Sequence, residues 1–308
     1  SFNFFHDGQN RQYYLYEPDS IQENAPLIFV LHGYSGSASG ILSYAGMNTV
    51  ADQYGFAVCY PNGTIDQSNN RFWNVGYAFH QNQTVDDVDF LSSLAYYLQL
   101  ENGYSSEKIF VTGMSNGGDM SYMLGCQADE IFKAIAPVAG CMMEEIYNTC
   151  DSSSIPVFEI HGTNDNVTLW DGDMNNNDGW GAYLSTLDGI DLWVEQNQCQ
   201  SSEEIAGPSL NTVHHRYFDC IDNTEVWLYE IIGGGHDWPA YSSQEIWSFF
   251  SQFIPSGDIN NDGTINIQDI IVLINIILES NFESDADINN DGIVNILDIV
   301  QLVNIILN

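Results

Sequence analysis

The chain of 308 residues is strongly acidic, with 42 Asp and Glu residues, five Lys and Arg residues and a formal net charge of −37. This balance excludes nucleic acid binding, which needs clustered cations, and makes anionic membrane surfaces poor partners. Hydrophobic residues make up 44% of the sequence, enough for a sizeable core. The sequence contains no apolar run of eighteen residues, so no membrane span is predicted. The acidity fits a saline environment or the binding of metal cations, although a soluble surface kept apart by self-repulsion explains it as well.

Strand-like and helix-like patterns alternate along the first 254 residues. Short apolar runs that end at glycine, such as APLIFVLHG at 25–33, are typical of buried parallel strands. Leu and Tyr at three- and four-residue spacing predict a helix over 85–103, and a closing helix is expected over 243–254. The alternation predicts a doubly wound α/β sheet, with the Asn-rich segment 171–181 as a loop or lid. Its strands are predicted at 25–33, 56–63, 108–113, 132–140, 155–162 and 224–234.

The central chemical signal lies in VTGMSNGGDMSYML, which holds the chain's one Gly-x-Ser-x-Gly pattern, Gly113 to Gly117. The bare pattern is weak, but an apolar strand precedes it and a helix-like run follows, as a nucleophile elbow requires. Glycines are needed because larger side chains would collide with neighbouring backbone at so sharp a turn. The turn exposes the hydroxyl of Ser115 and points the N–H groups of the new helix at the reacting centre.

A serine hydroxyl needs a base, and the elbow fold places an acid and then a histidine after the serine. Asp165 follows the fifth predicted strand and His236 follows the sixth, where α/β sheets build their sites. His236 would take the serine proton, and Asp165 would hold its tautomer. The predicted oxyanion donors are the backbone N–H groups of Asn116 and Tyr34, with Gly33 as an outside alternative to Tyr34.

Three tryptophans are candidate walls of a substrate pocket, namely Trp73, Trp180 and Trp238. Trp238 lies two residues after the proposed base His236, so it is expected to lie close to that base in space. Ordinary core or lid packing is the alternative for the other two. His32 and His161 stand at strand ends and are expected to be packed or supporting residues instead of catalytic groups.

Six cysteines are present and none forms a Cys-x-x-Cys pair, which argues against zinc and thioredoxin-like sites. Cys141 and Cys150 flank one loop-like segment, and Cys199 and Cys220 flank another. Two disulfides with these pairings, in an exported protein, are the preferred interpretation. Six reduced thiols are the alternative.

The first 254 residues resemble a known family through a set of motifs that occur in the right order. The combination is specific, although each motif alone is not. The resemblance covers 12–254 and is to the secreted polyhydroxybutyrate-depolymerase and feruloyl-esterase group within carbohydrate esterase family 1. It implies an α/β-hydrolase fold and a serine esterase, and it carries the triad onto Ser115, Asp165 and His236. The motifs are LHGYSGSASG, YPNG, FWN, VDDVDFL, GMSNGGDMSYML, IAPVAG, HGTND and GGGHDWP.

The last part of the chain is a duplicated unit. The hexapeptide DINNDG begins at 258 and again at 287, and fifteen of the twenty-one positions aligned between 258–278 and 287–307 are identical. Each copy has oxygen-bearing residues at positions 1, 3, 5, 9 and 12 of an EF-hand loop and a glycine at position 6, with a backbone carbonyl at position 7. A solvated acidic turn is the alternative. The predicted calcium ligands are Asp258, Asn260, Asp262, Thr264, Asn266 and Asp269 in the first loop, and Asp287, Asn289, Asp291, Ile293, Asn295 and Asp298 in the second.

This duplicated half-EF-hand resembles a type I dockerin across 258–308. The resemblance implies two structural calcium ions and a cohesin-like scaffold partner. One departure bears on that partner, because dockerins often carry Ser or Thr at loop positions 10 and 11. Here those positions hold Ile267-Gln268 and Ile296-Leu297.

The predicted organisation is an α/β-hydrolase esterase domain over 1–254, a short linker over 255–257 and a dockerin-like domain over 258–308. The preferred function is a secreted serine esterase that releases feruloyl, other hydroxycinnamoyl or acetyl groups from polysaccharides, with feruloyl slightly favoured. The alternatives are a polyester depolymerase and a non-catalytic, calcium-dependent attachment protein. Residues 1–5 would be a mature N-terminus after export.

Overall fold

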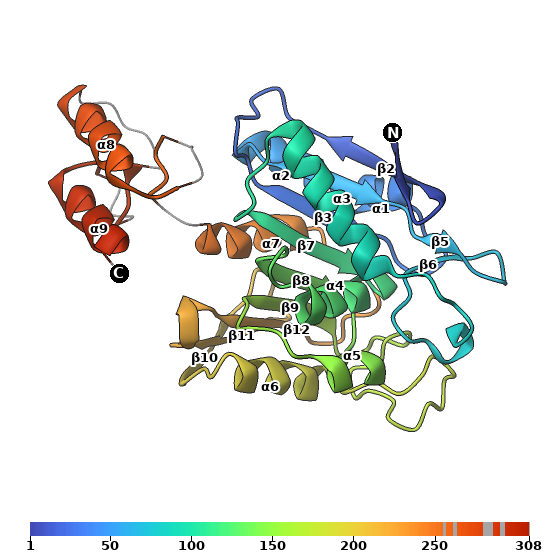
Figure 1. Cartoon of the computed structure of the whole chain (residues 1–308). Coiled ribbons are helices and arrows are strands. Elements are labelled where there is room, and N and C mark those ends of the chain that lie inside the picture. Colours follow the sequence, from blue (N-terminus) through green and yellow to red (C-terminus); the bar gives the residue numbers. More distant parts are fainter. Residues whose placement is uncertain (255–256, 261–263, 280–285, 290–292, 308) are drawn as a thin grey trace.

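The computed structural model describes residues 1–254, 257–260, 264–279, 286–289 and 293–307, and in these residues the largest element is a ten-stranded mixed sheet (Figure 1). Its strands are β1 (Phe2–His6), β2 (Gln9–Tyr16), β3 (Leu27–Leu31), β4 (Ala57–Pro61), β7 (Ile109–Met114), β8 (Ala134–Val138), β9 (Val157–Gly162), β10 (Ser201–Ala206), β11 (Thr212–Phe218) and β12 (Val226–Ile231). The six central strands run parallel in the order β4-β3-β7-β8-β9-β12. Antiparallel pairs extend both edges, β1-β2 beside β4 and β11-β10 beside β12. A small hairpin, β5 (Thr64–Ile65) with β6 (Arg71–Phe72), lies outside this sheet.

Helices cover both faces of the sheet (Figure 1). The faces have separate apolar cores because consecutive strand residues point to opposite sides. In β3, Leu27, Phe29 and Leu31 join one core, whereas Ile28 and Val30 join the other. The first core is covered by α3 (Asp87–Asn102), α4 (Asn116–Gln127), α5 (Glu144–Thr149) and α6 (Thr186–Gln196). The second is covered by α1 (Ala38–Ala45), α2 (Met47–Tyr54) and α7 (Ser242–Phe250). Three short 3-10 turns are η1 (Ala78–His80), η2 (Ile221–Asn223) and η3 (Ser251–Phe253).

The predicted strands correspond to the six parallel strands, and the two predicted helices to α3 and to α7 with η3. The α/β-hydrolase sheet is therefore confirmed, and 171–181 contains no helix or strand. The antiparallel edge strands were not predicted. The edge strand β10, with the sequence SSEEIA, is polar and largely exposed, so it lacks the apolar run that marks a buried strand.

The disulfide prediction is half right. Cys199 pairs with Cys220 as expected, but Cys150 pairs with Cys126, not with Cys141. Cys126 lies in the last turn of α4, and α5 brings Cys150 back against that end. Cys141 instead has its backbone N–H held 2.8 Å from a carboxylate oxygen of Asp119, which keeps its thiol at the base of a pocket.

Replacing both Cys126 and Cys150 by serine is expected to lower the free energy of unfolding of the large domain by about 3 kcal/mol, because the bridge closes a loop of 24 residues. Urea unfolding followed by tryptophan fluorescence measures the change. Cys141→Ser is the matched control and is expected to cost far less. A non-reduced peptide map that links Cys141 to Cys150 would contradict the pairing.

The C-terminal residues form a core of their own. Helices α8 (Ile267–Glu279) and α9 (Ile296–Leu307) pack through Leu273, Ile276 and Leu302, together with Ile259 and Ile288. Each helix follows one copy of the repeat, as the sequence predicts. The boundary near residue 255 stays a prediction. Within the described ranges, none of the helices has the length and apolar character needed to cross a bilayer.

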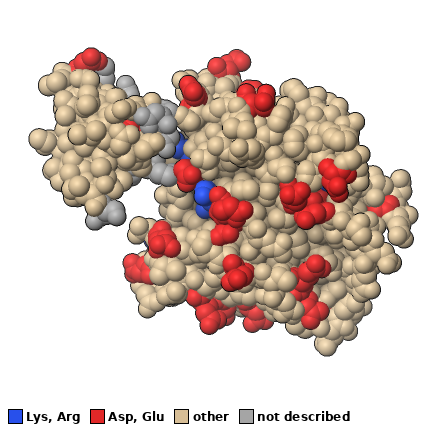
Figure 2. Space-filling model, viewed as in Figure 1, with Lys and Arg blue, Asp and Glu red and all other residues tan. Residues whose placement is uncertain are grey.

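Acidic side chains are scattered over one face of the molecule instead of gathered in one patch (Figure 2). On the face drawn in Figure 2, red Asp and Glu side chains are spread widely, and blue Lys and Arg side chains show in one small area. One of the few cations is buried, since Arg11 donates to Asp87 at 2.7 Å with its guanidinium over the ring of Phe90. This dispersed charge favours mutual repulsion between molecules.

Candidate active site

Ser115 stands on a strained turn between β7 and α4. Its backbone has φ 56° and ψ −123°, a conformation that side chains rarely adopt. The turn is held by the Ser115 N–H, which donates to the carbonyl of Val138 at 2.9 Å. A Cβ atom at Gly117 would overlap the carbonyl of Leu31, and one at Gly113 would overlap the backbone of Gly117. Close contact with neighbouring backbone therefore requires both glycines.

His236 and Asp165 meet at the carboxyl ends of β12 and β9. Nδ1 of His236 lies 2.7 Å from Oδ2 of Asp165. The other carboxylate oxygen accepts the N–H groups of Val167 at 2.8 Å and Thr168 at 2.9 Å. Burial favours a raised pKa for Asp165, but the hydrogen bond and charge of His236 outweigh it and lower that pKa. An ionised Asp165 only accepts, so Nδ1 of His236 carries the proton and Nε2 is left as a base.

Ser115 is joined to His236 less tightly than Asp165 is. Within the described part of the chain, no hydrogen bond of 3.5 Å or less joins the Ser115 hydroxyl to His236. Ser115 and His236 nevertheless lie near the same pocket. Ser115 and Asp119 both line this pocket, and His236 is close enough to Asp119 for its charge to lower the pKa of that carboxyl. Catalytic hydrogen bonds are often long in unliganded sites and shorten when the substrate binds.

Two backbone N–H groups flank the serine. Asn116 opens α4, and its N–H and that of Tyr34 donate to no acceptor in the ranges that the structure describes. A Cβ atom at Gly33 would lie 3.4 Å from Cβ of Ser115, which shows how closely the loop after β3 approaches the elbow. His32 braces this loop, because its Nε2 accepts the N–H of Gly63 at 3.0 Å. Burial lowers the pKa of His32 to about 4, so it stays neutral.

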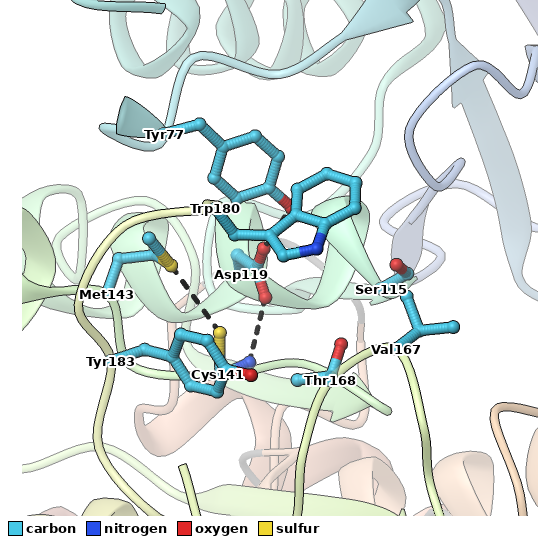
Figure 3. Close-up of a pocket in the computed structure, with 9 residues that line it drawn as sticks. All are labelled: Tyr77, Ser115, Asp119, Cys141, Met143, Val167, Thr168, Trp180 and Tyr183. Atoms are coloured by element: carbon cyan, nitrogen blue, oxygen red, sulfur yellow. Dashed lines mark hydrogen bonds between the residues drawn. The ribbon is translucent and has the colours of Figure 1, made fainter. Parts of the chain in front are cut away.

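A small pocket opens beside the serine (Figure 3). Its cavity volume is about 20 Å³, room for a group the size of a water molecule or a methyl. Asp119 lies in it, accepting from the hydroxyl of Tyr77 at 2.7 Å, and burial raises the pKa of Asp119 to about 6. The lining residues are Tyr77, Ser115, Asp119, Cys141, Met143, Val167, Thr168, Trp180 and Tyr183.

The three predicted tryptophans lie in different surroundings. Trp180 lines the pocket, and in Figure 3 its indole extends across it above Asp119. Trp73 is fully buried and donates its indole N–H to the carbonyl of His32 at 2.9 Å. Trp238 is 5% exposed and borders a different hollow, lined by residues 209–241. Of the three, Trp180 therefore lines the pocket beside Ser115, while the backbone of Trp73 is hydrogen-bonded to the neighbouring Asn116.

Most of the pocket was not predicted. Asp119 stands one helical turn after Ser115, so the four-residue spacing on α4 was a usable signal. Tyr77, Met143 and Tyr183 come from connecting segments, where no sequence period predicts which side chains meet.

The described residues of the first predicted calcium loop are hydrogen-bonded around the carboxylate of Asp269. This side chain is fully buried, and its Oδ1 accepts the backbone N–H groups of Ile259 at 2.8 Å and Asn260 at 3.0 Å. Its Oδ2 accepts the N–H of Asn266 at 2.8 Å. The side-chain amide of Asn266 lies 2.9 Å from the carbonyl of Thr264, so the predicted ligands at positions 7 and 9 are adjacent.

The second loop repeats these bonds. Asp298 is buried and accepts from the N–H groups of Asn289 at 3.2 Å and Asn295 at 2.7 Å. Asp262 and Asp291, predicted at position 5, lie outside the described residues. No group of three His, Cys, Asp or Glu side chains suited to a metal occurs within the described ranges. The described donors are oxygens of Asp, Asn and backbone, which are chemically suited to calcium.

Two family models match the chain. The model of esterase PHB depolymerase matches residues 11–188, and that of the dockerin type I domain matches residues 256–307. The first match covers more than half of the chain.

Curated relatives and a solved structure agree with this assignment. The chain is 24% identical to a bifunctional acetylxylan esterase/xylanase of Neocallimastix patriciarum, over 83% of the chain and 35% of that protein. It is 27% identical to feruloyl esterase B of Piromyces equi, over 74% of the chain and 42% of that protein. The acetyl xylan esterase of Aspergillus awamori shares the fold, with a TM-score of 0.61 and 17% identity over 79% of this chain and 94% of that one. The chain thus spans well under half of the two sequence relatives, and it belongs to the esterase PHB depolymerase family.

Proposed function

We propose that the protein is a secreted serine carboxylic-ester hydrolase that releases acyl groups from polysaccharides. The observation that supports this most is the 2.7 Å contact between Asp165 and His236 in the same site as the strained Ser115. The N–H groups of Tyr34 and Asn116, which donate to no acceptor among the described residues, flank that serine and supply the charge stabilisation that ester cleavage requires.

The proposed reaction proceeds in two halves. Nε2 of His236 removes the proton of the Ser115 hydroxyl as its oxygen attacks the ester carbonyl, and the N–H groups of Tyr34 and Asn116 bind the oxyanion. His236 then gives that proton to the leaving sugar oxygen, and the C–O bond breaks to leave an acyl-serine. Water, deprotonated by His236, attacks the acyl-serine, and His236 returns that proton to the Ser115 oxygen as the C–O bond breaks and the carboxylic acid is released. Asp165 stabilises the imidazolium in both halves.

The size of the pocket bears on the acyl group. A cavity of about 20 Å³ has room for the methyl of an acetyl group, whereas a hydroxycinnamoyl ring is larger than this cavity. The tight pocket therefore supports acetyl as the preferred acyl group over feruloyl. Polyester cleavage is the second candidate, favoured by the match to the PHB depolymerase model.

A substrate panel with a pocket variant tests the proposal. Acetylated xylan is expected to give a kcat/KM at least tenfold above those of methyl ferulate and polyhydroxybutyrate. Trp180→Ala enlarges the pocket and is expected to raise kcat/KM for methyl ferulate relative to p-nitrophenyl acetate, whereas Trp238→Ala, outside the pocket, should leave that ratio unchanged. Preference for methyl ferulate in the unaltered protein would reject the acetyl assignment.

For the C-terminal residues we propose two structural calcium sites. Asp258, Asn260, Asp262, Thr264, Asn266 and Asp269 would hold one ion, and Asp287, Asn289, Asp291, Ile293, Asn295 and Asp298 the other. The ions would neutralise loops in a segment with nine acidic residues and no Lys or Arg. The loops, closed on Asp269 and Asp298, support this assignment.

The proposed partner of this region is a cohesin-like scaffold protein. Ile267 and Ile296, at position 10 of the two loops, are 67% and 68% exposed. A partner that covers these isoleucine side chains needs an apolar surface. A surface suited to hydrogen-bonding the Ser or Thr hydroxyls that dockerins often carry at this position would not fit them.

A further inference from the structure

A second histidine contacts the carboxylate of Asp165. Nε2 of His161 lies 3.5 Å from Oδ2, the same oxygen that is 2.7 Å from His236. The side chains of His161 and Asp165 are both fully buried. Strand β9 explains the arrangement, because Glu159 and His161 are two residues apart and point to the same face, and Asp165 follows in the turn that ends the strand.

The hydrogen-bond acceptors around His161 show how many protons its ring and the carboxyl of Glu159 carry between them. Nε2 lies 2.9 Å from the carbonyl oxygen of Thr168, which only accepts, so Nε2 carries a hydrogen. Nδ1 lies 2.8 Å from Oε1 of Glu159, and a hydrogen bond there needs one proton, held by the ring or by the carboxyl. Glu159 and His161 are therefore neutral as a pair, with the N–H end of the ring facing Asp165.

The burial of Glu159 supports a neutral pair. Its side chain is 1% exposed, and within the described residues its Oε2 makes no hydrogen bond of 3.5 Å or less, although the hydroxyl of Tyr122 and the backbone of Gly140 lie near the carboxyl. Keeping an isolated carboxylate in such surroundings is costly unless a proton is close at hand. Burial raises the pKa of Glu159 to about 7, even though His161 acts in the opposite direction.

We propose that Glu159 and His161 are positioning residues that set the basicity of His236 through Asp165. Their shared proton keeps the positive end of the His161 ring against Asp165. The positive end of the ring stabilises the ionised carboxylate of Asp165. It thereby reduces the extent to which that carboxylate stabilises the protonated form of His236. The inference rests on the proposed hydrolase function, in which Nε2 of His236 must be free to accept the serine proton.

The other titratable groups around the pair do not supply this effect. Tyr122 of α4 and Cys141 after β8 face Glu159, and burial raises the pKa of both far above neutrality, so they stay uncharged. Asp119 of α4 is bonded to Tyr77 and to the N–H of Cys141. On β12, which pairs with β9, Glu230 is bonded to His215 at 2.8 Å.

The pH profile of kcat/KM for p-nitrophenyl acetate tests the proposal in the full chain. Glu159→Gln places a neutral amide beside His161, so the ring loses the carboxylate that favours its positively charged form, and protonated His236 becomes more stable. The acid limb is then expected to move to higher pH by roughly half to one pH unit. His161→Gln retains a donor near Thr168 and is expected to shift the limb in the same direction.

A histidine–carboxylate pair between β1 and α3 provides the control. His6→Gln breaks the 2.7 Å contact with Asp89, outside the site, and is expected to leave the acid limb unchanged. If Glu159→Gln and His161→Gln lower the unfolding temperature without moving the limb, the pair is merely structural and the proposal is wrong.

A measurement on the unaltered protein tests the proposal even if these variants do not fold. Nitrogen NMR of the imidazoles is expected to show Nε2 of His161 protonated throughout pH 5 to 8, and an unprotonated Nε2 would overturn the proposal. If the unaltered protein turns over no ester, the hydrolase function fails, while this NMR result still decides where the proton lies.

Discussion

Ser115→Ala is expected to lower kcat/KM for p-nitrophenyl acetate by about 10⁵-fold or more, because the hydroxyl that forms the acyl intermediate is removed. The fold should persist, since the strained turn is held by backbone contacts such as the Ser115 N–H to Val138. A stopped assay at high enzyme concentration with acetate quantified by NMR measures the residual rate.

Two variants separate nucleophilic chemistry from loss of structure. Asp165→Asn keeps the shape of the side chain but disturbs the tautomer of His236, so a fall of roughly 10³- to 10⁴-fold is expected. Ser43→Ala, on the exposed side of α1, is the serine control and should retain full activity. Turnover that is unchanged in Ser115→Ala and no faster than the uncatalysed rate would end the hydrolase interpretation and restore that of a non-catalytic attachment protein.

The sequence was most informative where the chemistry is local. A buried parallel strand is marked by its apolar run, and an elbow by glycines whose Cβ atoms would overlap backbone, as at Gly117. Asp165 and His236 each follow such a strand directly, so their approach to one edge of the sheet follows from the strand order. The placement of these residues could therefore be predicted before any coordinates were known.

Features that depend on contacts between distant segments could not be predicted this way. Cys150 is nine residues from Cys141 in sequence, but α5 carries it to Cys126. The pocket is closed by Tyr77, Trp180 and Tyr183, whose meeting depends on how long loops fold back. The pair of Glu159 and His161 was visible as an alternation along β9, yet its contact with Asp165 appears only when the following turn is folded.

Removal of calcium is expected to unfold the C-terminal residues while ester hydrolysis continues. The nine acidic residues of this segment have no Lys or Arg to offset them, and the loops close on Asp269 and Asp298, so without the ions they repel one another. At a thousandfold excess over the dissociation constant, each ion stabilises the folded state by about 4 kcal/mol. Calorimetry of the full chain should show one transition that falls when EGTA is added and a second that does not move.

The separate cores make the independence of the two transitions a physical expectation. The core of α8 and α9 is built from described residues between Ile259 and Ile306, whereas the cores on the sheet draw on residues up to Ile254. Calcium should restore the lower transition, and magnesium at the same concentration should not, because it is smaller and demands stricter octahedral geometry. Asp269→Asn with Asp298→Asn should make the chelator ineffective while activity is retained. If EGTA abolishes turnover together with both transitions, the chain folds as one cooperative unit and the proposed division is wrong.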